Sequence, residues 1–178
     1  MWSLDLFRCE TLSLRTHWVM VVMDQCTRRI IGFAIHAGVP DGPTVCRMLA
    51  TAIAGAEAPP RHLSTDHDAL FEFHRWKANV QIPEIEPIKT VPYVPLSHPF
   101  AERLIGTVRR ELLDHVPFWN ARDLERKLAA FKVYYNAART HRSLDGQTPT
   151  EAPKPRQQLG SMSWQQYCRG LYQLPIPA

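Results

Sequence analysis

The sequence predicts an α/β fold, a mixed five-stranded sheet with helices packed against it. Three short strand patterns come first and are joined by connections of a few residues, which favours an antiparallel three-strand meander. Two further strand patterns alternate with segments of helical periodicity, and two long amphipathic helices follow. With 178 residues, of which 45% are hydrophobic, the chain has the size of one globular domain with an appendage.

The first three strands follow from two patterns. Residues 2–7 alternate, so that Leu4 and Leu6 lie on one face of the strand and Asp5 on the other. The second strand is apolar almost throughout, which is typical of a central strand covered on both faces. A polar turn then leads into the third strand. We expect these strands at residues 2–7, 17–24 and 30–35.

Helical periodicity marks the later elements. Asp41 is a helix cap, and the apolar stripe that follows it ends before Pro59. Pro99 suits the first turn of the next long helix, whereas Asn120, with Asp123 three residues on, resembles a capping box at the start of the last one. We expect helices over 41–56, 97–112 and 121–138, a weakly patterned helical segment around 71–76, and strands over 61–65 and 85–94, the last at a sheet edge because Pro87 and Pro92 interrupt it.

The composition limits the classes of partner and environment. A net charge of +4 fits a polyanionic partner without establishing one. The four cysteines are scattered, so neither a zinc site nor a disulfide scaffold is indicated. No apolar run approaches the roughly 20 residues of a membrane span. We therefore expect a cytoplasmic protein without a membrane partner, and the proline- and glutamine-rich residues 154–178 are expected to form an irregular C-terminal extension.

Three carboxylates stand where a sheet edge can bring them together. Asp5 lies in the first strand, Asp66 directly follows the fourth, and Glu102 lies on the first turn of a helix. If the first and fourth strands are neighbours, the three side chains converge, and a divalent cation relieves their repulsion. Oxygen ligands favour Mg²⁺ or Mn²⁺, and two such ions activate a nucleophile and stabilise the leaving oxygen of a phosphate. For each residue alone, the alternative is a solvated surface carboxylate.

Two motifs carry a resemblance to a known family. Ser64-Thr65-Asp66-His67-Asp68 and Pro99-Phe100-Ala101-Glu102-Arg103 resemble the integrase catalytic core of bacterial insertion-sequence transposases and retroviral-type integrases, the DDE recombinases with an RNase H-like fold. Between Asp66 and Glu102 lie 35 residues, 67 to 101, the spacing that names the D,D(35)E group. The resemblance runs from about Trp2 to Pro153 and includes Asp24–Gly32, Tyr135-Asn136, His141-Arg142, Leu144 and Thr148-Pro149.

The resemblance implies a function and its residues. Residues 1–153 are expected to form an RNase H-like integrase catalytic core in which Asp5, Asp66 and Glu102 are the catalytic residues and metal ligands. Two Mg²⁺ ions, with Mn²⁺ as a substitute, would support DNA cleavage at transposon ends and strand transfer into target DNA. The partners implied are DNA, further copies of the chain and a separate or upstream helix-turn-helix segment, in a bacterial cytoplasm at the nucleoid.

Several points stay open in the sequence. Arg103, Arg109 and Arg110 flank Glu102 and are candidate phosphate contacts, with ordinary solvation as an equal alternative. His67 and Asp68 stand where the family usually has Asn-Gly. The alternative function is a truncated, non-catalytic DNA-binding or assembly remnant of an insertion-sequence transposase; a stand-alone RNase H-like nuclease is a third reading. His141-Arg142 matches a family motif without an assigned catalytic role.

Overall fold

The computed structural model describes residues 1–65, 71, 76, 85–89, 99–150 and 162–177. Five strands form one mixed sheet in the order β3-β2-β1-β4-β5, so β1 occupies the centre. The predicted antiparallel meander and the two further strands are confirmed. The strands are β1 (Trp2–Glu10), β2 (Thr16–Asp24), β3 (Ile30–Ala37), β4 (His62–Thr65) and β5 (Glu86–Lys89).

The two strands that bear on the candidate site are neighbours. β4 pairs in parallel with β1, with Trp2 opposite Leu63 and Ser3 opposite Ser64. β5 pairs in parallel with β4 and forms the edge of the sheet, as predicted. It is shorter than expected, and residues 90–94 of the predicted strand lie outside the described residues.

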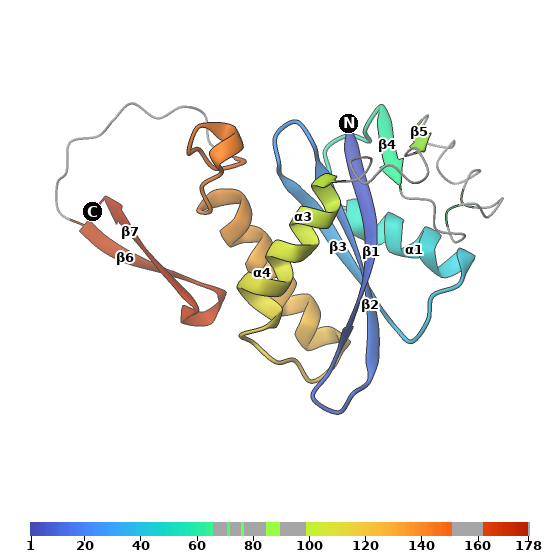
Figure 1. Ribbon diagram of the computed structural model, residues 1–178, viewed down its shortest axis with the longest axis horizontal. Helices are drawn as coiled ribbons and strands as arrows, with labels where there is room; N and C mark the ends of the chain where they lie inside the picture. Colours follow the sequence, from blue (N-terminus) through green and yellow to red (C-terminus); the bar gives the residue numbers. More distant parts are fainter. Residues whose placement is uncertain (66–70, 72–75, 77–84, 90–98, 151–161, 178) are drawn as a thin grey trace.

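Helices cover both faces of the sheet (Figure 1). Helix α1 (Gly42–Ile53) packs on one face, where its apolar stripe shares a buried cluster with Trp2 and Leu4. Helices α3 (Pro99–Val108) and α4 (Ala121–Ala137) pack on the other face, in a cluster that contains Phe7. The side chains of β1 therefore alternate between two cores, as its sequence predicts.

The predicted capping residues start their helices. The Asp41 side chain accepts a hydrogen bond from the Thr44 amide at 2.9 Å, and Asn120 accepts one from the Asp123 amide at 2.9 Å. Pro99 is the first residue of α3, also as predicted. Of the weak helical segment around 71–76, only Phe71 and Trp76 are described, and both are buried beside α1.

The helix predicted over 97–112 is not α-helical throughout. From Arg109 to Leu113 it is a π-helix, closed by a 2.9 Å hydrogen bond from the Asp114 amide to the Arg109 carbonyl. Leu112 is 1% exposed, so the wider turn keeps the apolar stripe on the core. Leu104, Val108 and Leu112 recur every four residues, a spacing that an α-helix also fits, so the sequence pattern did not distinguish the π turn.

Asn136 fastens α4 to the edge strand β3. Its Nδ2 donates to the Ile30 carbonyl at 2.9 Å, while its Oδ1 accepts from the Ile30 amide at 2.8 Å. The side chain thus satisfies the two backbone groups of Ile30 as a neighbouring strand would. Thr150 extends the connection, because its amide and hydroxyl both donate to the Asn136 carbonyl.

The expectation of an irregular extension is wrong for residues 162–177. Strands β6 (Met162–Tyr167) and β7 (Tyr172–Pro177) form an antiparallel hairpin around a 3₁₀ turn, η4 (Cys168–Gly170). The hairpin is attached to α4 by its tyrosines and not by a run of aliphatic residues. The polar sequence of this segment therefore gave no clear strand pattern. The division of the chain at residue 153 stays a prediction, because residues 151–161 lie outside the described residues.

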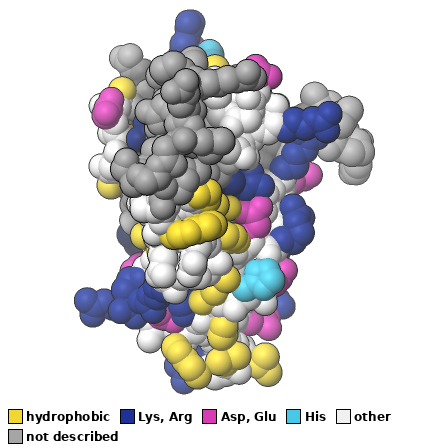
Figure 2. Space-filling model, turned by 90° about the vertical axis from the view of Figure 1, so that its left-hand side faces the viewer, with side chains coloured by type: hydrophobic (Ala, Val, Ile, Leu, Met, Phe, Trp, Pro, Cys, Tyr) yellow, Lys and Arg dark blue, Asp and Glu magenta, His cyan; other side chains and the backbone are white. Residues whose placement is uncertain are grey.

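Aromatic contacts hold the hairpin against α4. The Tyr172 ring stacks on Tyr134 with centroids 4.2 Å apart and planes 2° apart, and its hydroxyl donates to the Glu111 carbonyl. Tyr167 contacts the same Tyr134 ring at 5.9 Å. Figure 2 shows this side of the molecule, where hydrophobic side chains gather over the middle and the lower end, with Lys and Arg side chains on either side.

We expect Asn136→Ala to destabilise the fold by about 2–4 kcal/mol, because the amide and carbonyl of buried Ile30 both lose their partner. Urea unfolding measures this change. Asn136→Asp should also destabilise, since a carboxylate cannot donate to the Ile30 carbonyl. Val133→Ala is the matched control on the same helix, because Val133 is 58% exposed and its truncation should cost about 0.5 kcal/mol or less. Equal effects of Asn136→Ala and Val133→Ala would contradict the role of Asn136.

Candidate functional site

Asp5 lies on the sheet face that α3 and α4 cover. In the ladder it stands opposite Val21, and Val21 and Phe7 both belong to the core beneath those helices. Asp5 is half-buried, and its Oδ1 accepts a hydrogen bond from the Leu6 amide at 2.7 Å. The carboxylate therefore projects from the centre of the sheet toward the helical layer.

Glu102 lies on the first turn of α3, and its side chain is exposed. Its neighbours along the helix set its position. Ala101, Leu104 and Val108 are at most 2% exposed and form the stripe that packs on the sheet. Glu102 is about 100° around the helix from Ala101, so it flanks the buried stripe without entering the core.

Arg109 shows which strand this flank of α3 faces. Its Nη2 donates to the Arg8 carbonyl of β1 at 2.8 Å, and its guanidinium lies 5.5 Å from the centroid of the Phe7 ring. Glu102 precedes Arg109 by seven residues, and side chains at that spacing lie on the same side of a helix. The flank that carries Glu102 is therefore the one directed to β1.

Asp66, the remaining predicted ligand, lies outside the described residues, as do His67 and Asp68. Within the described part of the chain, no group of three or more His, Cys, Asp or Glu side chains is arranged to hold a metal ion. The structure describes β4 as far as Thr65, the residue directly before Asp66.

The three predicted phosphate-binding arginines are all exposed, but they lie on different sides of the helix. Arg109 contacts β1 through the Arg8 carbonyl. Arg110 folds back along the helix, because its Nη1 lies 2.9 Å from where a Cβ on Gly106 would be. Arg103 lies on the flank turned away from β1, where it lines a small cavity beside α4. Glycine at position 106 leaves the room that Arg110 occupies.

A charged cluster follows α4, at the end of the sheet where α3 begins. Arg139 forms a bidentate ion pair with Glu111, with Nη2 to Oε1 at 2.7 Å and Nε to Oε2 at 2.9 Å. Its Nη1 lies 3.3 Å from Nδ1 of His141. Burial lowers the pKa of His141, and the positive charge of Arg139 lowers it further. Sequence reasoning noted His141 as a motif residue but missed Arg139, whose partner Glu111 is 28 residues away.

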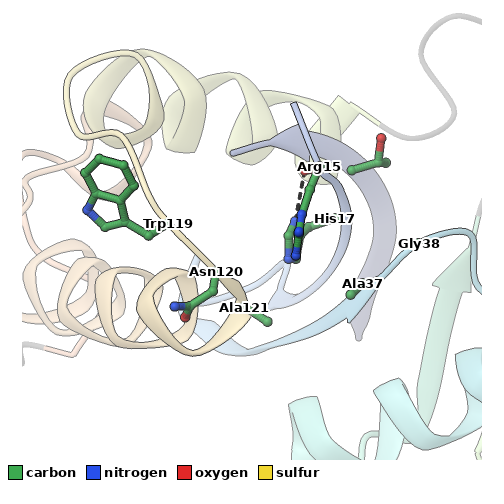
Figure 3. A pocket seen from close by; sticks show the side chains of 8 residues that line it. Arg15, His17, Ala37, Gly38, Trp119, Asn120 and Ala121 are labelled. Carbon is green, nitrogen blue, oxygen red and sulfur yellow. Dashed lines mark hydrogen bonds between the residues drawn. The ribbon is translucent and has the colours of Figure 1, made fainter. Parts of the chain in front are cut away.

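A different cavity, of about 480 Å³, lies at the far end of the sheet (Figure 3). Trp119 and His17 lie at opposite ends of its lining, and the His17 ring is 3.1 Å from the Arg15 carbonyl. His17 stands opposite Cys9 in the sheet, four residues along β1 from Asp5, or about 13 Å. This cavity is therefore separate from the end of the sheet where Asp5 and Glu102 lie.

The comparisons with known proteins show which proteins the chain is similar to. Residues 84–149 match the family model of the integrase core domain. The chain is 28% identical, over 142 residues, to the insertion element IS476 uncharacterized 39.2 kDa protein of Xanthomonas euvesicatoria. Over these residues the chain is similar to integrase cores. That match covers 80% of the chain but 40% of the Xanthomonas protein, so the chain spans less than half the length of this curated relative.

Solved structures of integrase cores share the fold of this chain. The catalytic core domain of BIV integrase aligns with a TM-score of 0.56 at 18% identity, over 83% of this chain and 89% of that one. The HTLV-2 integrase catalytic core, determined with magnesium, aligns at 0.61 and 14%, over 83% and 91%. A chain of the simian T-cell lymphotropic virus intasome, in complex with PP2A regulatory subunit B56 gamma, aligns at 0.63 and 16%, over 92% and 60%. The predicted RNase H-like fold is confirmed.

Membrane insertion finds no support in the described helices. None of them combines the length and the apolar character that crossing a bilayer requires. The longest, α4, has 17 residues and carries several charged side chains.

We expect His141 to titrate below the ordinary histidine value of about 6.5, because burial and Arg139 disfavour its charged form. Its contribution to stability is then present above that value and is lost as the pH falls from it toward the folded-state pKa. Arg139→Gln should raise the titration midpoint, since it removes a positive neighbour and leaves Glu111. Histidine ring signals followed by NMR measure both midpoints, and His141→Gln assigns the signal. A wild-type midpoint at or above 6.5 would refute this expectation.

Proposed function

We propose that this chain is the catalytic core of a DDE-type transposase or integrase, which cleaves DNA strands and transfers them with Asp5, Asp66 and Glu102. One observation carries the proposal. Asp5 projects from the central strand toward the helical layer, and the flank of α3 that bears Glu102 is directed to that same strand. This arrangement occurs in a chain related to the integrase cores.

Helix and strand geometry supports a close approach of Asp5 and Glu102. The contact between Arg109 and Arg8 provides a fixed reference point. From Arg109 back to Glu102 is seven helical residues, or about 10 Å of rise. From Arg8 back to Asp5 is three strand residues, also about 10 Å. Because α3 and β1 start at the same end of the sheet (Figure 1), equal steps bring the two carboxylates level.

Asp66 completes the proposed triad. β4 is hydrogen-bonded in parallel to β1, with Ser3 opposite Ser64. The proposal requires the residue directly after Thr65 to stand at this end of β4, beside Asp5. Three carboxylates converging there would repel one another unless a cation joined them.

The donor set fits Mg²⁺. Carboxylate oxygens are the ligands that this hard cation prefers, and Asp5, Asp66 and Glu102 would hold it. A solved HTLV-2 integrase core of the same fold was determined with magnesium. When bound, two such ions would lower the pKa of an attacking water or hydroxyl and stabilise the negative charge on the leaving oxygen. We propose Mn²⁺ as a substitute, because it accepts the same oxygen ligands.

The chain's own residues would position the reacting strand. In cleavage, water forms a bond to phosphorus as the bond from phosphorus to the 3′-oxygen breaks. In strand transfer, the freed 3′-hydroxyl gives up its proton and its oxygen bonds to the phosphorus of a target phosphodiester, while the bond from that phosphorus to the target's 3′-oxygen breaks and the leaving oxygen takes up a proton. Arg103, Arg109 and Arg110 would bind flanking phosphates, which fixes the strand in register without reading its sequence.

The assembly around this core is also part of the proposal. The partners would be transposon-end DNA, target DNA, further copies of the chain, and a helix-turn-helix segment that recognises the DNA ends. The chain spans 40% of the Xanthomonas relative, so such a segment has room in a longer protein. A non-catalytic, DNA-binding remnant of a transposase is the alternative that the following measurement separates from the enzyme.

We expect the protein to nick supercoiled plasmid in the presence of Mn²⁺ or Mg²⁺ and not in EDTA. Asp5→Asn, Asp66→Asn and Glu102→Gln should each lower the nicking rate about 100-fold or more, because each removes a metal ligand. The matched control is Glu125→Gln, which removes an exposed carboxylate from α4. DNA affinity, measured in parallel by fluorescence anisotropy, should persist in all four variants. Metal-independent nicking, or DNA binding without any cleavage, would exclude the proposed enzyme.

A further inference from the structure

A small basic cavity lies on the flank of α3 opposite to Glu102. Its volume is about 150 Å³, and it lies between the start of α3, the turn that joins β2 to β3, and the segment after α4. This volume is well above the roughly 10–15 Å³ that one water requires and leaves room for one phosphate group. Its polar lining consists mainly of Arg28, Arg103, Arg139, His141 and Ser143.

Arg28 lines this cavity and carries a buried donor atom without a partner in the described part of the chain. Its guanidinium carbon lies 4.1 Å from the centroid of the Phe100 ring, which fixes the group over the first turn of α3. Its Nη1 is buried and makes no hydrogen bond to any described residue. The backbone of Arg28 has φ 63°, a region that a side chain of this size rarely adopts. The turn thus holds a charged donor at a position where its burial and its backbone both cost free energy.

His141 presents a second unpaired donor. An arginine N–H can only donate, so the contact of Arg139 Nη1 with Nδ1 of His141 makes Nδ1 the acceptor. The neutral ring then carries its proton on Nε2. This atom is buried, in a residue that is 9% exposed, and it has no partner among the described residues. Two residues from separate segments, each with an unpaired buried donor, therefore line one cavity.

The charge of the cavity favours an anion. Glu111 balances Arg139, whereas no ion pair within the described part of the chain involves Arg28 or Arg103. Two uncompensated guanidinium groups remain, together with the Nε2–H of His141 and the exposed Ser143 hydroxyl. A tetrahedral oxyanion with several acceptor oxygens matches these donors, while a cation or an apolar ligand does not.

We propose that this cavity binds one phosphate group of the DNA backbone and thereby directs the strand across the start of α3 to Glu102. The inference rests on the proposed function, which supplies the DNA. Glu102 and Arg103 are consecutive on the helix and lie on opposite flanks of it, so a strand held at Arg103 passes the end of the helix on its way to the carboxylates. The cavity is a positioning site and takes no part in the chemical step.

Two ligands test the chemistry of the cavity directly. Inorganic phosphate, added to the full chain at constant ionic strength with chloride as the reference anion, should shift the Nε2–H signal of His141 in a histidine ring NMR experiment. A short duplex DNA should shift the same signal. If phosphate or DNA leaves the His141 signal unshifted, the proposal is overturned. A shift with phosphate but not with DNA would also overturn it, because the cavity would then be a site for a free anion.

Surface variants test its role in DNA binding without disturbing the core. Ser143→Asp places a carboxylate at the cavity and should weaken duplex binding about tenfold. The matched control is Thr140→Asp, which adds the same charge at an exposed position three residues away that does not line the cavity. If the two variants lose the same DNA affinity, the loss comes from the added charge in general, and the site is refuted.

Salt dependence gives an independent measure. Arg28→Gln should reduce the slope of log affinity against log salt by about 0.9, the value for one lost phosphate contact on duplex DNA. Arg122→Gln removes an exposed arginine from α4 and should leave the slope as in the unchanged protein. An unchanged slope in a folded Arg28→Gln protein would overturn the proposal.

The plasmid assay separates this inference from the proposed function. If nicking requires Asp5 and Glu102 while Ser143→Asp and Thr140→Asp bind DNA equally, the proposed enzyme is supported and the phosphate site is refuted. If DNA shifts the His141 signal and Ser143→Asp weakens binding, but no metal-dependent nicking occurs, the phosphate site is supported and the proposed enzyme is refuted.

Discussion

The packing of α3 on the β1–β2 face is the interaction on which the candidate site depends. Leu104 and Val108 are at most 2% exposed and share one buried cluster with Phe7 and Val21. Burial of each such side chain contributes about 1.5–3 kcal/mol, so this contact fixes the helix firmly. It also decides the direction of the polar flanks, because a helix with its apolar stripe on the sheet has no rotational freedom left. One flank then faces β1 and the other faces α4.

The two flanks carry different charged groups near the start of α3, and Arg109 lies farther along the β1 side. The β1 side bears the Glu102 carboxylate near the strand that carries Asp5, whereas the α4 side bears Arg103 near Arg28. In the proposed function, the β1 side holds the metal ions and the α4 side binds a phosphate of the DNA strand. Such a division suits phosphoryl transfer, in which the protein contributes mainly position and charge. The helix separates groups that would neutralise one another if they met.

The second layer of support comes from α4. Asn136 joins it to the edge strand β3, and the segment that follows carries Arg139 and His141 to the start of α3. The ion pair of Arg139 with Glu111 ties this segment to the π-helical end of α3. The hairpin then covers the outer side of α4 through the stacked rings of Tyr172 and Tyr134. Motif residues without a catalytic role in the sequence thus have structural roles in the fold.

The sequence by itself determined what depends on local pattern. Alternation placed Asp5 on the face opposite to Leu4, a stripe of apolar residues defined α3, and Asp41 and Asn120 marked helix starts, because periodicity and capping act within a few residues. Only the tertiary structure decided the pairing of Asn136 with Ile30, 106 residues away, the docking of the hairpin and the placement of Arg28 and His141 beside one cavity. Those contacts join distant segments through polar and aromatic side chains, which leave no periodic signal in the chain.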